Sequence, residues 1–436
     1  MVGAVFGWLA PTLKTYRYSK SEFSLTDEDC SWMVALQFVG RICGCLLTAI
    51  TIDRFGRVAI ISLAAILMTI SWSAIVLTKV IGVHYILRFI FGSCLGMINL
   101  TTPIYTGENS SPQVRGIFGS SCLMLFFGGQ VVGCTLATYC SYTLVAAILA
   151  AISLVSLAST ILLREPTQYL LAKGREAKAE KQFFWLRGND ENAKNEFFQI
   201  RSKLEATEAK FSFNYLLDRR ILIVCGVNSL VFMTGFPAMS SLVSIALSPA
   251  GDFSTNELTI LFEVVQLVGA VVSLFVIDRF NRRTLWTISC TLAAVFHLMA
   301  ATLYYLNEQN SSLPGYSWLL FGSITGYTTV FSTLMYSLSC TVRGEFLPQK
   351  YKGAGSCTSL FINSGIGCVQ GFTFLKIASA YGMKVNFIVF AGSSIVLLAF
   401  CYCLVPETRG MSLVEIEKYF EDLKRTKENE KSTVKS

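Results

Sequence analysis

The feature that most constrains this fold is a series of apolar runs, each about 20 residues long, that recur along the chain. A helix of that length crosses the roughly 30 Å hydrocarbon core of a bilayer, so each run predicts a membrane-spanning helix. Only 15% of the residues are charged, against about 25% in soluble domains. We therefore expect an all-α membrane protein that crosses the bilayer many times.

The runs predict twelve spans, arranged as six plus six. The apolar start, Met1–Ala10, is too short to cross a bilayer, so we expect an incomplete first helix, as in a truncated gene model or a short isoform. Gly92 and Gly96 are spaced to let a neighbouring helix approach closely. The predicted domains are an N-terminal transmembrane bundle over 1–163, a cytosolic linker with amphipathic helices over 164–219, a C-terminal bundle over 220–405 and a cytosolic tail over 406–436.

Two charged phrases occur twice, in the same order, once in each half of the chain. Residues 53–57 read Asp-Arg-Phe-Gly-Arg, and residues 278–282 read Asp-Arg-Phe-Asn-Arg. The second phrase is an acid followed seven residues later by a base, at Glu108 and Arg115 and again at Glu345 and Lys352. Ordered markers in two apolar halves indicate an internal structural repeat.

The basic residues also predict the orientation. The turns at 53–57 and 278–283, the linker and the tail are rich in Lys and Arg, and the loops at 248–256 and 306–316 have none. The positive-inside rule therefore places the linker and the tail in the cytosol. Asn310, in an Asn-Ser-Ser sequon of an opposite loop, is then a candidate external glycosylation site.

Other classes of function are not supported. The net charge of +8 does not indicate a nucleic-acid partner, because the basic residues lie between the apolar runs. The 14 Cys show neither metal-ligand spacing nor a disulfide framework. We find no nucleophile with a base and no phosphate-binding glycine loop, so we expect no catalytic residue, no metal and no other cofactor.

Six phrases in order along the chain carry a family resemblance. They are Gly7-Trp8-x-x-Pro11, Asp53–Arg57, Arg88-Phe89-x-x-Gly92, Pro103-Ile-Tyr105-x-x-Glu108 with Arg115-Gly116, Leu170-Leu-x-Lys173-Gly174-Arg175 and Pro406–Gly410. With these phrases the chain resembles the sugar porter branch of the major facilitator superfamily, and within it the insect facilitative trehalose and glucose carriers. The resemblance implies a fold of two six-helix bundles and a carrier that works by alternating access.

The resemblance also implies a network of salt bridges at the cytosolic ends of the spans. Carboxylates and guanidinium groups there can hold the two bundles together in one state and release them in another. The implied members are Asp53, Arg54, Arg57, Arg88, Glu108, Arg115 and Glu165 in the first half, and Asp278, Arg282, Arg283, Glu345, Lys352 and Glu407 in the second. The alternative is that these charges only fix the topology.

The expected sugar site is strongly changed. The family's glutamine in span five falls at Leu123, and its glutamine pair in span seven falls at Val231 and Phe232. Each lost hydrogen bond to a sugar hydroxyl costs about 1–3 kcal/mol, so a sugar in the family's usual pose should bind poorly. The polar positions that remain as candidate substrate-binding residues are Gln266, Asn363, Ser332 and Tyr336.

Two further ionisable residues lie within predicted spans, where charge is expensive. Arg41 is in span two, and Glu263 is in span eight on the same helix face as Gln266. We hypothesise that both point into a central cavity, either paired or binding a charged solute. The alternative is that Arg41 reaches the membrane surface or packs between helices, and that Glu263 lies near the outer boundary.

Arg88 pairs with an acid of span one in proton-coupled relatives, but span one here contains no acid. The sequence therefore favours a facilitative carrier of a sugar-like small polar solute, monomeric, in the plasma membrane. Two alternatives stay open: a non-transporting sensor or decayed paralogue of a sugar carrier, and a carrier of a charged solute that is not a sugar.

Overall fold

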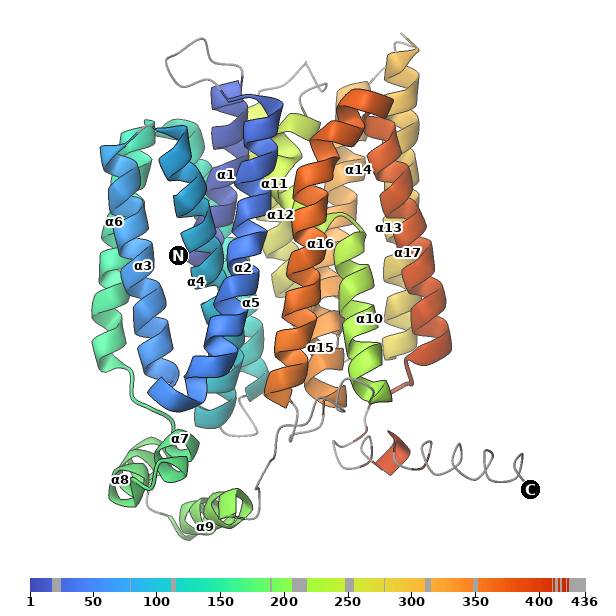
Figure 1. Cartoon of the computed structure of the whole chain (residues 1–436). Coiled ribbons are helices and arrows are strands. Elements are labelled where there is room, and N and C mark those ends of the chain that lie inside the picture. The colour runs from blue at the N-terminus through green and yellow to red at the C-terminus, as the bar shows by residue number, and fades with distance from the viewer. Residues whose placement is uncertain are drawn as a thin grey trace, which may run out of the picture. The chain divides into compact units, whose positions relative to one another are not determined.

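The computed structural model describes residues 1–17, 25–78, 80–110, 115–188, 190–205, 218–247, 255–277, 279–309, 315–347 and 352–409, with a few positions of the tail. Almost all of these residues lie in helices, and the predicted all-α membrane protein is confirmed (Figure 1). Within this described part, ten helices are long and apolar enough to cross a membrane.

The spanning helices follow the predicted apolar runs. They are α2 (Asp27–Phe55), α3 (Arg57–Leu77), α4 (Ile81–Asn109), α5 (Arg115–Tyr139), α6 (Tyr142–Ser159), α10 (Arg219–Met233) continued by α11 (Phe236–Ala246), α12 (Thr255–Val276), α13 (Arg282–Glu308), α16 (Lys352–Tyr381) and α17 (Met383–Leu404). Two of the twelve predicted runs form different structures. Run one forms the shorter helix α1 (Val2–Arg17). Run ten forms α14 (Tyr316–Val330), a π turn η3 (Phe331–Met335) and α15 (Tyr336–Phe346) in succession.

The contacts divide the chain into two compact units. The first unit comprises Met1–Phe211, Pro237–Val264 and Ser364–Lys376, and the second comprises Ser212–Phe236, Val265–Asn363 and Ile377–Ser436. The domain boundaries expected from the sequence remain a prediction. The two units are described separately below.

Glycines set the closest helix contacts of the first unit. A Cβ at Gly40 or Gly44 of α2 would collide with backbone of α4, and a Cβ at Gly92 or Gly96 of α4 would collide with backbone of α2. The glycines of α1 and α5 repeat this arrangement, at Gly3, Gly7, Gly129 and Gly133. Small residues four apart let two helix backbones touch, as the sequence predicted for Gly92 and Gly96.

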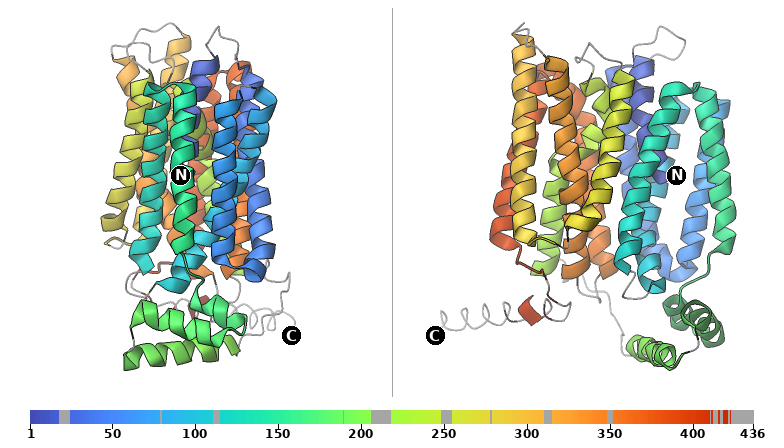
Figure 2. Two further views of the ribbon diagram at one scale, coloured as in Figure 1. Left: turned by 90° about the vertical axis from the view of Figure 1, so that its left-hand side faces the viewer. Right: turned by 180° about the vertical axis from the view of Figure 1, so that it is seen from behind.

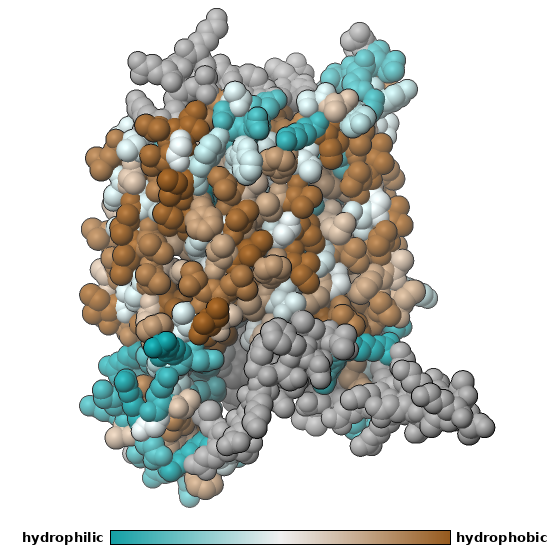
Figure 3. All heavy atoms as spheres, in the orientation of Figure 1, coloured by the Kyte–Doolittle hydropathy of each residue, from teal (hydrophilic) through white to brown (hydrophobic). Residues whose placement is uncertain are grey.

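The side chains of the spanning helices are apolar both inside the bundle and on its outer faces, unlike those of a water-soluble protein. Aromatic rings fill the interior of the first unit, where Trp72 lies 5.3 Å from Trp8 and 4.9 Å from Phe91 between ring centres. The outer faces are also apolar, with Leu77 81% and Ile161 85% exposed. Figure 3 shows hydrophobic residues over the spanning helices and hydrophilic residues over the linker helices. Such an outer surface suits lipid rather than water.

The linker of the first unit forms three short helices. They are α7 (Thr167–Ala172), α8 (Glu176–Arg187) and α9 (Glu191–Glu205), which lie beyond one end of the spanning helices of that unit (Figure 2). The phenol of Tyr169 in α7 donates a hydrogen bond to the carbonyl of Arg54 at 3.3 Å. The guanidinium carbon of Arg57 lies 5.1 Å from the centre of the Tyr169 ring. These contacts attach the linker to the ends of α2 and α3.

The seventh span is interrupted between α10 and α11, at Gly235 and just before Pro237. Gly235 takes φ +104°, a backbone conformation that residues other than glycine rarely adopt. The hydroxyl groups of Thr234 and Tyr327 lie 2.9 Å apart, and the ring of Phe236 stacks on Phe331 with centres 4.0 Å apart. The break in the seventh span is therefore fixed against the π turn of the tenth.

Candidate functional site

A first charge cluster, formed by Asp53, Arg57, Glu108 and Glu165, lies at the ends of α2, α3 and α4. Arg57 donates to both carboxylate oxygens of Glu108, from Nε at 3.0 Å and from Nη2 at 2.9 Å, and its Nη1 lies 3.2 Å from Asp53. The Glu165 carboxylate accepts the backbone N–H groups of Arg57 and Val58, both at 3.0 Å. It therefore binds the first free N–H groups of α3, where a negative charge is stabilising.

A second charge cluster, formed by Arg282, Glu345 and Glu407, repeats this arrangement in the second unit. Glu407 accepts the backbone N–H groups of Arg282 and Arg283 at the start of α13, each at 3.0 Å. Nη2 of Arg282 lies 3.6 Å from Glu345, which also accepts a hydrogen bond from the Thr408 hydroxyl at 2.7 Å. Arg282, Glu345 and Glu407 thus take the places of Arg57, Glu108 and Glu165. The two halves repeat in contacts as well as in sequence.

Partial burial raises the pKa of the Glu407 carboxyl. Hydrogen bonds from the backbone N–H groups of Arg283, Arg409, Arg282 and Thr408 outweigh this effect, so the pKa lies below its usual value of 4.5. The same donors favour the ionised form. The carboxylate is therefore held charged where it caps α13.

The other predicted members of the salt-bridge network have side chains that lie apart from the two clusters or outside the described residues. Arg54 lies over the ring of Phe55, with 5.6 Å between its guanidinium carbon and the ring centre. Nε of Arg283 donates to the carbonyl of Val405 at 3.2 Å. Asp278, the side chains of Arg115 and Lys352, and the sequon residue Asn310 lie outside the described residues.

Arg88 of α4 lies inside the first unit, away from the first charge cluster. It is 2% exposed, and its guanidinium carbon lies 4.6 Å from the centre of the Trp8 ring of α1. Its Nη1 donates to Gln37 at 3.3 Å and to the carbonyl of Val5 at 3.5 Å. An aromatic ring therefore lies where the proton-coupled pattern would place an acid.

Three of the four polar positions proposed for substrate are fully buried. Gln266, Asn363 and Ser332 are all 0% exposed, and Tyr336 is half-buried. With its amide oriented so that the nitrogen faces two backbone carbonyls, Asn363 donates hydrogen bonds to the carbonyl of Ser359 at 3.2 Å and to the carbonyl of Asn228 at 3.3 Å. A Cβ at Gly269, one turn beyond Gln266, would meet the hydroxyl of Ser332, so this part of α12 lies against the π turn.

Arg41 and Glu263 belong to the first unit and are 5% and 0% exposed. Neither side chain reaches a lipid-facing surface. Glu263 lies close enough to Cys134 of α5 to interact with it electrostatically. Buried ionisable groups at this depth are typical of functional positions in membrane proteins.

Sequence reasoning missed two sets of buried polar groups. Gln130 of α5 is 0% exposed, and neither atom of its amide has a hydrogen-bond partner within the described residues. In the second unit, Asn228 of α10 accepts hydrogen bonds from Ser339 at 2.6 Å and from Arg343 at 2.7 Å. A sequence signal for these residues was available, because each is a polar side chain within an apolar run. Burying such a side chain in a membrane is costly, so it often marks a functional position.

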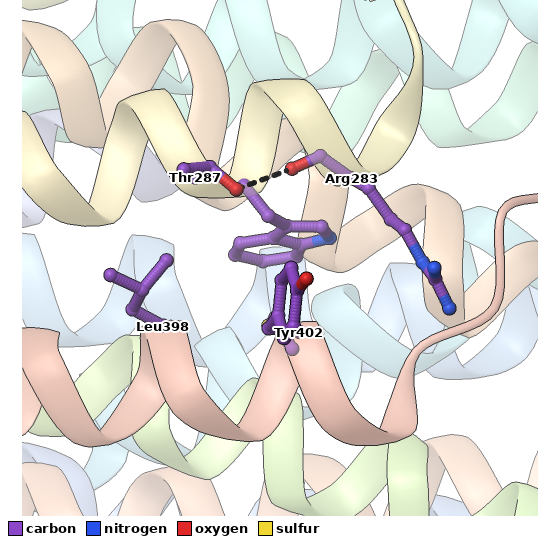
Figure 4. A pocket seen from close by; sticks show the side chains of 6 residues that line it. Arg283, Thr287, Leu398 and Tyr402 are labelled. Carbon is purple, nitrogen blue, oxygen red and sulfur yellow. Dashed lines mark hydrogen bonds between the residues drawn. The ribbon is translucent and has the colours of Figure 1, made fainter.

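A small surface depression lies between α13 and α17. It is lined by Arg283, Trp286, Thr287, Leu398, Cys401 and Tyr402, and Thr287 donates to the Arg283 carbonyl at 3.0 Å (Figure 4). Its polar side chains are those of Arg283, Thr287 and Tyr402, and none of the residues predicted to bind substrate lines it.

The chain is similar to known proteins over almost its whole length. A family model described as "Sugar (and other) transporter" matches residues 2–420. The facilitated trehalose transporters Tret1 of Polypedilum vanderplanki and Bombyx mori are 26% and 27% identical; the matches cover 96% and 95% of this chain and 85% and 83% of those proteins.

Solved structures with the same fold include the xylose transporter XylE from E. coli in its inward open conformation. The TM-score is 0.77 at 18% identity, with 96% of this chain and 97% of that chain covered. The major facilitator proton:xylose symporter XylE bound to 6-bromo-6-deoxy-D-glucose gives a TM-score of 0.76, also at 18% identity and the same coverage. At this identity the likeness shows the fold, which is that of the major facilitator superfamily.

Proposed function

The chain belongs to the sugar (and other) transporter family, and we propose that it is a facilitative carrier of a sugar or a similar small polar solute. Members of this family are transporters rather than enzymes. The proposed mechanism is alternating access, in which the protein exposes its solute site to each side of the membrane in turn.

The observation that carries this proposal is the retention of both charge clusters. A protein needs basic residues at its cytosolic ends to fix its topology, but it does not need acids paired with them. Here Arg57 binds Glu108 and Arg282 binds Glu345, while Glu165 and Glu407 cap the following helices. Such charged groups can be held in one state and separated in the other, which a carrier requires.

The facilitative mechanism rests on Arg88. A buried arginine paired with an acid can link proton binding to transport, because protonation of the acid changes the charge of the pair. The ring of Trp8 lies against Arg88 and cannot be protonated. We therefore propose a uniporter.

A second function is supported by the apolar residues of the seventh span. Val231 and Phe232 are 0% and 5% exposed, and neither offers a hydrogen bond to a hydroxyl group. A chain that kept the fold and lost its solute site would serve as a sensor or be a decayed paralogue. A carrier of a charged solute is the other alternative, supported by the buried Arg41 and Glu263.

Uptake in a transporter-null cell tests these functions. Labelled trehalose, glucose, fructose, polyols, acidic sugars and amino acids would be offered to cells with this chain at the surface and to cells with the empty vector. Saturable uptake of at least one solute above the control supports the carrier. Absence of uptake for the whole panel, at normal surface levels, supports the non-transporting alternative.

We also propose the plasma membrane as the location, with the linker and the tail in the cytosol. Asn310 would then face outside and carry an N-linked glycan. Digestion with a glycosidase should increase the gel mobility of the wild-type protein and leave an Asn310→Gln variant unchanged. A wild-type protein that does not shift would contradict the external position.

A further inference from the structure

Arg343, near the end of α15, turns its side chain into the interior of the second unit. Its Nη2 donates a hydrogen bond to Oδ1 of Asn228 at 2.7 Å. Asn228 is 0% exposed and lies nine residues after Arg219, the first residue of α10. At a helical rise of about 1.5 Å per residue, the guanidinium lies roughly 13 Å along the span from its polar end.

The direct partners of this guanidinium within the described residues are neutral. Asn228 also accepts a hydrogen bond from Ser339 at 2.6 Å and donates from Nδ2 to the carbonyl of Val224 at 2.8 Å, so its amide is held in one orientation. Among the described residues, no carboxylate lies within ion-pair distance of Arg343, and its buried Nε has no hydrogen-bond partner. By contrast, Arg220 at the start of α10 is paired with Asp218 at 3.1 Å.

Arg343 is half-buried and its Nε is fully buried, and a cation withdrawn from water among neutral partners is costly in a membrane protein. A guanidinium has five N–H donors in a planar fork that fits a carboxylate, and one contact to Asn228 leaves most of them available. Two buried hydroxyl groups of the same unit, Ser337 of α15 itself and Ser359 of α16, also have no hydrogen-bond partner within the described residues. These groups are suited to the hydroxyls of a small polar solute.

We propose that Arg343 binds the carboxylate of an acidic sugar, so that the solute of this carrier is a polyhydroxy carboxylate of the hexuronate class. Asn228 and Ser339 are positioning residues, which hold the guanidinium in place. This inference rests on the proposed transport function and names its substrate class. An acidic solute bound through its carboxylate would depend less on the family's neutral glutamine pair, which is replaced here by Val231 and Phe232.

Glucuronate and glucose form the matched pair that tests the inference, because they differ by one carboxylate. Wild-type protein in transporter-null cells should take up glucuronate in preference to glucose. Arg343→Gln should lower the ratio of glucuronate to glucose uptake by about 10- to 100-fold, the value of a charge-assisted contact. Arg343→Lys, which keeps the charge, should retain part of the glucuronate uptake.

Asn228→Asp is the sharper variant, because it keeps the shape of the side chain and places a carboxylate beside Arg343. This internal ion pair should compete with the solute and lower glucuronate uptake as strongly as Arg343→Gln. Arg220→Gln is the matched control: it removes an arginine that already has an acidic partner, and the ratio of glucuronate to glucose uptake should not change. Surface levels of all variants would be measured in parallel.

Binding to the purified protein separates this inference from transport. Glucuronate should raise the Tm of wild-type protein and not that of Arg343→Gln, because a ligand stabilises the folded state to which it binds. Such a difference without uptake would support the anion site and contradict the carrier function. Uptake of glucose alone, or an uptake ratio that Arg343→Gln leaves unchanged, would overturn the inference and leave the carrier function standing.

Discussion

Arg57 and Glu108 are joined by two parallel hydrogen bonds, Nε to Oε2 at 3.0 Å and Nη2 to Oε1 at 2.9 Å. Their side chains are 11% and 12% exposed, so the pair is largely removed from water. Arg282 and Glu345 occupy the same places in the second half, at 3.6 Å. A largely buried arginine–glutamate pair therefore occurs in each half of the chain, joined at two points in the first half and by one ion pair in the second, and it is the structural basis of the proposed mechanism.

The first prediction concerns the Arg57–Glu108 pair. Arg57→Gln should leave the Glu108 carboxylate buried without its cation, destabilise the protein by about 3 kcal/mol and lower its Tm. Uptake should fall by at least tenfold if the pair forms and breaks in each transport cycle. The control is Arg201→Gln, because the Arg201–Glu176 pair is 45% and 58% exposed and should contribute little to stability. Equal effects of the two variants would contradict a special role for Arg57.

The second prediction concerns Glu407 and pH. Because the pKa of this carboxyl is lowered in the folded state, its contribution to stability is present above the usual value of 4.5 and is lost as the pH falls through the lower folded value. The Tm of the wild type should therefore fall as the pH drops below about 4.5. Glu407→Gln should start from a lower Tm at pH 7 and lose less on acidification. Parallel curves for the two proteins would show that Glu407 does not contribute.

The third prediction concerns energy coupling. With Trp8 rather than an acid against Arg88, uptake should not accelerate when an inward proton gradient is imposed on proteoliposomes. An uncoupler should therefore leave the initial rate unchanged. Acceleration by the gradient would show proton symport and exclude the proposed uniporter.

The fourth prediction concerns the buried amides. Gln266→Ala and Asn363→Ala should each raise the KM for the transported solute by about 5- to 100-fold, which corresponds to one or two lost hydrogen bonds. Ser394→Ala is a suitable control, because this buried hydroxyl donates its hydrogen bond to the carbonyl of Phe390 in its own helix. An unchanged KM in both amide variants would remove them from the proposed site.

The fifth prediction concerns the buried charges of the first unit. If Arg41 and Glu263 face the solute, Arg41→Ala and Glu263→Gln should each change the rate of uptake or the range of solutes accepted. The measurement is the same uptake panel, normalised to surface level. If both variants keep the uptake rate and the solute range of the wild type, these side chains serve helix packing and not solute binding.

Much of the fold was predictable because membrane spans leave a strong local signal. Runs of apolar residues gave the spans, and the repeated charged phrases gave the two-fold organisation. The close approach at Gly92 and Gly96 was also visible, since glycine acts through the backbone at its own position.

The side-chain clusters were harder to predict because their members are distant in sequence. Asn228 and Arg343 are 115 positions apart and neither belongs to a motif, so only the packing of α10 against α15 brings them together. The contact of Arg88 with Trp8 likewise depends on how α1 lies against α4. The π turn at Phe331–Met335 also left no signal that sequence reasoning used.

The most direct test of the central claim is solute counterflow in proteoliposomes. Vesicles containing the purified chain would be loaded with unlabelled solute and diluted into the labelled form, with glucose and glucuronate measured separately. An alternating-access carrier exchanges the two forms, so labelled solute should transiently accumulate inside above its outside concentration, and vesicles without the protein should show no such overshoot. Absence of an overshoot for every solute of the panel, with protein that is folded and correctly inserted, would contradict the account.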